Sequence, residues 1–158
     1  MSAARSHKPM GFKLPVSVLV VVHTADLEVL LLERASRPGF WQSVTGSLDL
    51  PEEPLEAAAA RELKEETGID AAQGRLSRWN VVNTFEIFQQ WRHRYAPGVV
   101  HNTEHVFGLA LPERLPVVLS PTEHTAFAWL PWREAAEKCF SWSNRDAIVM
   151  LGERAVIT

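Results

Sequence analysis

The chain has 158 residues and a net charge of −3, and 46% of its residues are apolar against 22% charged. This length and balance are typical of one globular domain and exclude a disordered or fibrous chain. A pI near 6.1 excludes a broad basic surface. We therefore expect no nucleic-acid partner and, if the partner is anionic, a small molecule.

The N-terminal residues and the cysteine content predict the domain boundaries and the cellular compartment. We expect residues 1–10 to be a flexible tail and residues 11–155 to form a single domain. The most apolar run, Val16–Val22, is far shorter than the roughly 20 residues that a bilayer helix needs, so no membrane partner is expected. Cys139 is the only cysteine, which fits a reducing compartment and predicts a cytoplasmic protein.

Two strands are predicted near the start of the chain. The valine-rich run Val16–Val22 is typical of a buried central strand. A turn around Asp26 separates it from the short apolar run Glu28–Arg34, so the two are expected to form a hairpin. The segment SRPGFWQ, residues 36–42, is predicted to be a turn because it contains a Pro-Gly pair.

The clearest helix is predicted for Pro54–Thr67, where strong helix formers include four consecutive alanines and Gly68 follows as a C-cap. Strands, this helix, further strands and closing helices predict an α/β fold in which helices cover a mixed sheet. The later elements are predicted as strands at 78–88, 103–111 and 125–130 and as helices at 131–138 and 143–151.

Three glutamates crowd one face of the predicted helix. Glu62, Glu65 and Glu66 are spaced by three and four residues, so their side chains emerge together and repel one another. A solvated face relieved by Arg61 and Lys64 would explain such a cluster. A site for divalent cations would also explain it, because carboxylate oxygens are ligands that Mg²⁺ prefers.

The residues around this cluster favour the cation site. Gly46, Glu53 and the run RELKEETGI from Arg61 to Ile69 resemble the signature of the Nudix hydrolases. The loop between Gly46 and Glu53 is one residue longer than that family usually has. Counting back from Arg61 selects Glu53 rather than Glu52 as the signature glutamate. The resemblance implies a Nudix fold, an α/β/α sandwich around a mixed sheet.

The resemblance also implies metal-dependent cleavage of a phosphoanhydride. The expected cofactor is Mg²⁺, with Mn²⁺ as an alternative. Glu53 and Arg61 are expected to form an ion pair that orients the metal ligands, while Leu55, Ala59 and Leu63 are expected in the core. The metal ligands that the resemblance implies are Glu62, Glu65, Glu66 and, from the later TEH segment, Glu123.

Three further segments resemble a branch of the Nudix family that acts in folate biosynthesis. They are FWQSVTGS, FEIF with RHRYAPGV, and TEH with SWSNR. This resemblance implies hydrolysis of dihydroneopterin triphosphate to the monophosphate and diphosphate. The implied substrate-binding residues are Lys13, Arg34, Thr45, Phe85, Glu86, Ile87, Phe88 and Ser141.

Several alternatives stay open at this point. Glu86 either accepts hydrogen bonds from the aminopyrimidine edge of a pterin or faces solvent. The catalytic candidates are Glu65, Glu66 and Glu123, and either Glu66 or Glu123 can be the base that deprotonates water. Rival functions are a pyrophosphatase for nucleoside or deoxynucleoside triphosphates and a non-catalytic nucleotide-binding module. A monomer and a homodimer are equally compatible with the sequence.

Overall fold

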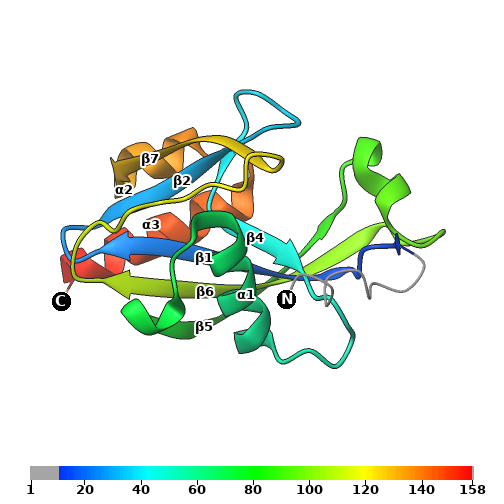
Figure 1. The fold of residues 1–158 in the computed structure, drawn as a ribbon, viewed down its shortest axis with the longest axis horizontal. Coiled ribbons are helices and arrows are strands. Elements are labelled where there is room, and N and C mark those ends of the chain that lie inside the picture. The colour runs from blue at the N-terminus through cyan, green and yellow to red at the C-terminus, as the bar shows by residue number, and fades with distance from the viewer. Residues whose placement is uncertain (1–10, 158) are drawn as a thin grey trace.

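The computed structural model describes residues 11–157, and in that range seven strands form one mixed sheet (Figure 1). The path through the sheet is β3-β2-β1-β6-β5, with β4 paired to β1 and β7 paired to β2. The predicted tail, residues 1–10, lies outside the described residues. The strands are β1 (Val16–Thr24), β2 (Glu28–Arg34), β3 (Trp41–Gln42), β4 (Val44–Ser47), β5 (Arg75–Glu86), β6 (His101–Leu111) and β7 (His124–Pro131).

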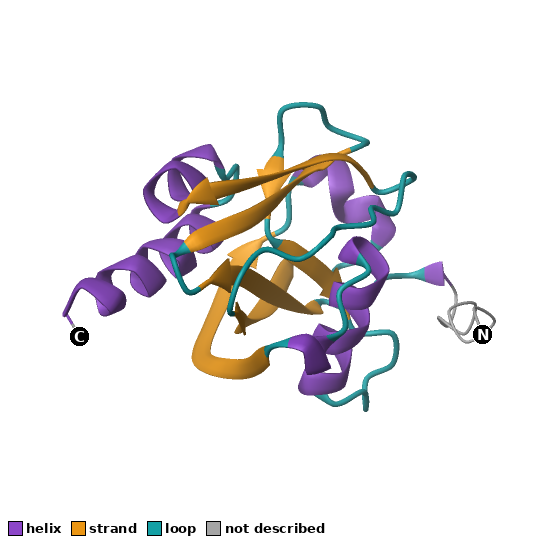
Figure 2. Ribbon diagram, turned by 60° about the vertical axis from the view of Figure 1, so that its left-hand side comes forward, coloured by secondary structure: helices purple, strands orange, loops and turns teal. Residues whose placement is uncertain are grey.

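Helices cover both faces of this sheet, so the α/β/α sandwich that the Nudix resemblance implied is confirmed (Figure 2). One face carries α1 (Leu55–Thr67), which ends where Gly68 adopts a φ of 76° and donates its N–H to the Lys64 carbonyl. The other face carries α2 (Trp132–Lys138) and α3 (Trp142–Ile157). Two short 3₁₀ helices, η3 (Ala71–Gln73) and η4 (Gln89–Arg94), lie in the connections.

β1 is central because its side chains are apolar on both faces. Its even-numbered valines, such as Val18 and Val20, pack in the core beneath α1, whereas Leu19 and Val21 pack toward α2 and α3. One edge of β1 runs parallel to β6 along its whole length. The other edge pairs antiparallel with β4 over residues 17–20 and with β2 at His23.

The expected helices and long strands are present, with three differences. The predicted hairpin forms, but its register pairs only His23 with Val29, because β4 occupies the next part of the β1 edge. β3 and β4 were missed, since two and four residues are too short for an alternating pattern. α3 also extends past the predicted residue 151. None of the helices among the described residues has the length and apolarity to cross a membrane.

Candidate active site

A cleft of about 520 Å³ lies beside β4 and is lined from both faces of the sheet. β4 pairs with β1 and with no other strand in the described range, so its outer edge is open to the cleft. Residues of α1 line one end of the cleft, and residues of β6 and of the start of α3 line the other. The predicted site residues that line it are Lys13, Arg34, Thr45, Glu62, Glu66, Phe85, Glu86, Ile87, Phe88, Glu123 and Ser141.

Glu66 is the most deeply buried carboxylate of the cleft, with 1% of its surface exposed. Burial raises the pKa of Glu66 well above its ordinary value, Glu62 and the charge of Glu123 raise it further, and the backbone N–H of Thr45 opposes them. Its Oε1 accepts no hydrogen bond within residues 11–157, although His124 Nε2 lies 3.9 Å away. A carboxylate in these surroundings is stabilised by a cation.

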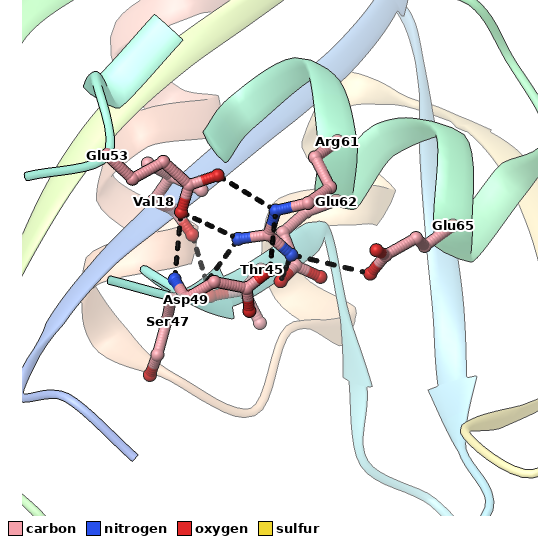
Figure 3. A network of polar contacts seen from close by, with 8 residues as sticks. All are labelled: Val18, Thr45, Ser47, Asp49, Glu53, Arg61, Glu62 and Glu65. Carbon is pink, nitrogen blue, oxygen red and sulfur yellow. Dashed lines mark hydrogen bonds and ion pairs between the residues drawn. The ribbon is translucent and has the colours of Figure 1, made fainter. Parts of the chain in front are cut away.

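Arg61 joins the signature residues into one network, which Figure 3 shows. Its guanidinium donates to both oxygens of Glu53, from Nε at 2.9 Å and from Nη2 at 3.0 Å. It also donates to Glu62 Oε2 at 2.9 Å and to the Ser47 carbonyl at 3.2 Å. Burial lowers the pKa of Arg61, but its bonds to Glu53 and Glu62 outweigh burial and raise it. The predicted ion pair between Glu53 and Arg61 is therefore confirmed.

The longer loop keeps Glu53 in place. The Asp49 N–H donates to Glu53 Oε1 at 2.8 Å, and the Glu53 N–H donates to the Leu50 carbonyl at 3.1 Å. Glu52 is exposed. The loop thus accommodates its extra residue before Glu53, so α1 keeps the register that the signature requires.

Gly46 of β4 allows close contact between the sheet and the carboxylates of α1. A Cβ atom at this position would lie 2.2 Å from Cδ of Glu62. Any side chain here would therefore displace the Glu62 carboxylate from its place beside Arg61. This packing contact accounts for the glycine of the signature.

The structure does not bring all the predicted metal ligands together. Glu62, Glu66 and Glu123 line the cleft, whereas Glu65 is not among its lining residues and lies 3.5 Å from Arg61 Nη1. Among residues 11–157, no three His, Cys, Asp or Glu side chains are already grouped as a metal site. The residues nevertheless fit a divalent cation, because the buried Oε1 of Glu66 faces like charges and lacks a hydrogen-bond donor.

Two cationic side chains, Arg34 and Lys13, line the same cleft as these carboxylates. Arg34 Nη1 donates to Gln42 Oε1 at 3.2 Å, and its guanidinium lies 4.7 Å from the ring centroid of Trp91. The buried Nε of Arg34 has no acceptor in the described part of the chain. Lys13 Nζ lies 5.7 Å from the centroid of Tyr95. Both cations line the cleft, where they can meet an anionic ligand.

The two predicted hydroxyl contacts are held by the backbone. Thr45 Oγ1 donates to the Val18 carbonyl at 2.9 Å, so its remaining capacity is as an acceptor. Ser141 Oγ accepts the Asn144 N–H at 3.2 Å and retains its own proton for donation. Both residues line the cleft, and the structure fixes their positions without assigning them a ligand.

Aromatic side chains form a wall of the cleft. Phe85 meets Trp142 edge to face with centroids 6.5 Å apart, and Phe88 stacks on Trp91 at 5.1 Å. Ile87, between Glu86 and Phe88 in the chain, is 4% exposed and also lines the cleft. A flat heterocycle can pack against such a wall.

Glu86 lies at the exposed rim of this wall. Its side chain is 70% exposed, and its Oε2 is 3.4 Å from Arg92 Nη2. The structure thus places Glu86 in reach of solvent and of the cleft, so its predicted contact with substrate stays a prediction.

Other lining residues were not predicted. Trp91 directly precedes the RHRYAPGV segment and Tyr95 lies within it. Asn102 and Glu104 are buried polar residues on β6, a strand whose other inward-facing residues are apolar. That interruption of an apolar pattern is a signal that the sequence contains and that the predictions did not use.

An acidic helix packed on a mixed sheet, beside a cleft with opposed cations, is the arrangement of a Nudix hydrolase. The NUDIX domain family model matches residues 13–150. Since this match covers most of the chain, the protein belongs to the Nudix family.

Particular relatives are more specific than the family. The chain is 49% identical to dihydroneopterin triphosphate diphosphatase of Escherichia coli over 144 residues, covering 89% of this chain and 94% of that one. It is 39% identical to the enzyme of the same name from Haemophilus influenzae over 142 residues, covering 88% of both. The solved structure of the E. coli dihydroneopterin triphosphate pyrophosphohydrolase superposes with a TM-score of 0.81, covering 87% of this chain and 94% of that one.

Proposed function

We propose that this protein hydrolyses dihydroneopterin triphosphate to dihydroneopterin monophosphate and diphosphate, a reaction of folate biosynthesis. The observation that carries the proposal is the 49% identity to the E. coli enzyme of that activity across 89% of the chain. The cleft supports it, because the residues expected to bind phosphate and pterin line one continuous cavity. We also propose that residues 11–155 act as one domain in the cytoplasm.

In this proposal the α1 end of the cleft binds the triphosphate. Arg34 and Lys13 bind phosphate oxygens, with the unpartnered Nε of Arg34 as one donor. Arg61 holds the Glu62 carboxylate in a fixed orientation through its own bond to Glu53. The phosphates and the glutamates are both negative, so they require an intervening cation.

Glu62, Glu66 and Glu123 are the residues we propose to hold that cation, with Glu65 joining from the adjacent turn of α1. Mg²⁺, or Mn²⁺ in its place, would lower the pKa of attacking water and neutralise charge on the phosphates. Glu66 or Glu123 would accept the proton from water.

The pterin would lie toward α3. Phe85 and Phe88 would pack against its ring. Ser141 would donate to its side chain or the first phosphate, and Thr45 would accept from a side-chain hydroxyl. Glu86 would contact the ring from the rim. A pyrophosphatase for nucleoside triphosphates would use the same α1 end and differ only in these ring contacts.

The test is a diphosphate-release assay with Mg²⁺ on dihydroneopterin triphosphate beside the common nucleoside and deoxynucleoside triphosphates. The expected result is a kcat/KM for the pterin substrate at least about tenfold above any nucleotide, which corresponds to one good hydrogen-bonded contact. The expected products are the monophosphate and diphosphate, and a chelator should stop the reaction. A nucleotide preferred over the pterin, or orthophosphate as the product, would overturn the proposal.

A further inference from the structure

Two buried polar side chains interrupt the apolar face of β6 within the cleft. Asn102 and Glu104 are each 5% exposed and line the cavity. They are two residues apart on one strand, so both side chains point to the same face of the sheet. Parallel pairing sets Glu104 beside Ser17, and Leu19 beside Val106, in the layer that packs toward α2 and α3.

Each of the two side chains has an acceptor atom that no group in residues 11–157 satisfies. The atoms are Oε1 of Glu104 and Oδ1 of Asn102. The amide of Asn102 is oriented by donating from Nδ2 to Ser17 Oγ at 2.8 Å. Glu104 is held by hydrogen bonds from Ser143 and Asn83, which oppose the rise that burial causes in its pKa. Buried acceptors without donors are costly, and these two line a cavity from which a ligand can supply the donors.

The start of α3 is fixed where it meets this pair. Asn144 accepts the Ser43 N–H at 2.7 Å and donates to Ser43 Oγ at 3.0 Å. This clamp ties α3 to the segment between β3 and β4, and it holds the neighbouring Ser143 against Glu104. The acceptors are therefore rigid, which favours selective binding over loose contact.

The pair lies on the opposite face of β4 from the signature glutamates. Gly46 faces Glu62 on the α1 side, whereas its neighbours Thr45 and Ser47 pair with Leu19 and Ser17. Side chains of successive strand residues alternate between faces. A ligand that passes around the open edge of β4 thus meets carboxylates of α1 at one end and the Asn102–Glu104 acceptors at the other.

We propose that Glu104 and Asn102 form the specificity site for the heterocycle, accepting hydrogen bonds from a ring N–H and an adjacent exocyclic amino group. The ligand class is a 2-amino-4-oxopyrimidine edge, which presents those two donors side by side. This inference rests on the proposed function for the rest of the substrate. It assigns ring recognition to the buried Glu104, whereas the 70% exposed Glu86 contributes a contact at the rim.

The experiment measures binding of neopterin, a fluorescent compound with this edge and no phosphate, by fluorescence titration without metal. Glu104→Gln keeps the size of the side chain and removes part of its acceptor capacity. Glu86→Gln is the matched control, since it makes the same chemical change at the exposed rim. The expected dissociation constant rises about tenfold or more in Glu104→Gln and less than about threefold in Glu86→Gln.

A second comparison uses the unmodified protein. Pterin carries the 2-amino group and lumazine carries an oxo group at the same ring position, so the wild type should bind pterin more tightly. The preference should shrink in Glu104→Gln. Equal binding of the two by the wild type, no measurable neopterin binding, or a larger loss in Glu86→Gln would each overturn the assignment.

These outcomes separate the inference from the proposed function. If the protein fails to hydrolyse dihydroneopterin triphosphate but loses neopterin binding in Glu104→Gln, the recognition site stands and the reaction is a different one. If hydrolysis is as proposed and Glu104→Gln binds neopterin like the wild type, the reaction stands and the assignment of Glu104 is wrong.

Discussion

Glu66 and Glu104 are both buried carboxylates of one cleft, but they lie on opposite faces of the sheet and have different neighbours. Glu66 is surrounded by other carboxylates. Burial is the largest cause of its raised pKa, and Glu62 and Glu123 raise the pKa further. Glu104 is surrounded by neutral donors, since Ser143 and Asn83 lower the pKa that burial raises. The first environment fits a cation, and the second fits neutral N–H donors.

The comparison teaches that burial alone does not define the role of a carboxylate. The carboxylates around Glu66 repel its charge, and in our proposal a divalent cation offsets that repulsion. The neighbours of Glu104 leave one oxygen without a donor, and in our proposal an uncharged ligand group fills that place and distinguishes one substrate from another. Substitutions at the two ends of the cleft should therefore have separable effects.

The largest effect is expected for Glu66→Gln. Removing this carboxylate should lower kcat/KM by about a hundredfold or more on every substrate, because it acts on the shared phosphate chemistry. The assay is diphosphate release with Mg²⁺, on the pterin triphosphate and on whichever nucleotides the wild type cleaves. Near-normal turnover in this variant would contradict the role of α1 in holding metal.

The same variant should be more stable than the wild type without metal. A raised folded-state pKa means that the native protein binds more protons than the unfolded chain, so stability falls as pH rises through that pKa. Glu66→Gln removes this loss. The melting temperatures of the metal-free proteins should be similar at acid pH and diverge in favour of the variant as pH rises.

A smaller effect is expected at the signature ion pair. Glu53→Gln should lower activity by about tenfold to a hundredfold, since it loosens Arg61 and through it Glu62. Glu52→Gln is the matched control and should be close to wild type because Glu52 is exposed. Deleting Glu52 should also be tolerated. If the deletion unfolds the domain and Glu53→Gln leaves activity unchanged, Glu53 is not the signature glutamate.

Gly46→Ala tests the contact between the sheet and α1. The added Cβ would meet the flexible end of the Glu62 side chain, so the fold should persist while the carboxylate moves. We expect kcat to fall by about tenfold with a small change in melting temperature. The kcat and the melting temperature should be measured on one preparation. A variant with the kcat of the wild type would mean that the position of the Glu62 carboxylate is unimportant.

The smallest effect is expected for Glu86→Ala. Its carboxylate is exposed, so its hydrogen bonds compete with water and are worth about 0.5–1.5 kcal/mol, or roughly two- to tenfold in kcat/KM. The loss should be larger for dihydroneopterin triphosphate than for a nucleoside triphosphate. An unchanged ratio of the two kcat/KM values would assign Glu86 to the solvent face.

The acidic end of the cleft could be predicted from the sequence because it lies on one helix with a fixed period. The spacing of Glu62, Glu65 and Glu66 specifies a common helix face, and the ion pair of Glu53 and Arg61 followed from the signature. What the spacing could not give is the distance of Glu65 from the cleft, which depends on how α1 rolls against the sheet.

The end of the cleft near β6 and α3 could not be predicted from the sequence in the same way. It joins Ser17, Asn102 and Ser143, which come from three elements far apart in the chain, and strand register decides which of them meet. β4, which separates the two ends, has only four residues and no alternating pattern. The long strands and α1 were predictable because each has enough residues to show a clear periodic pattern of apolar side chains.

The most direct test measures neopterin binding and diphosphate release in the same two variants. The account predicts that Glu66→Gln loses turnover but binds neopterin, in the absence of metal, as tightly as the wild type does. It predicts that the dissociation constant for neopterin rises about tenfold or more in Glu104→Gln. A Glu66→Gln protein that loses neopterin binding as strongly as Glu104→Gln would contradict the division of the cleft into a phosphate end and a ring end.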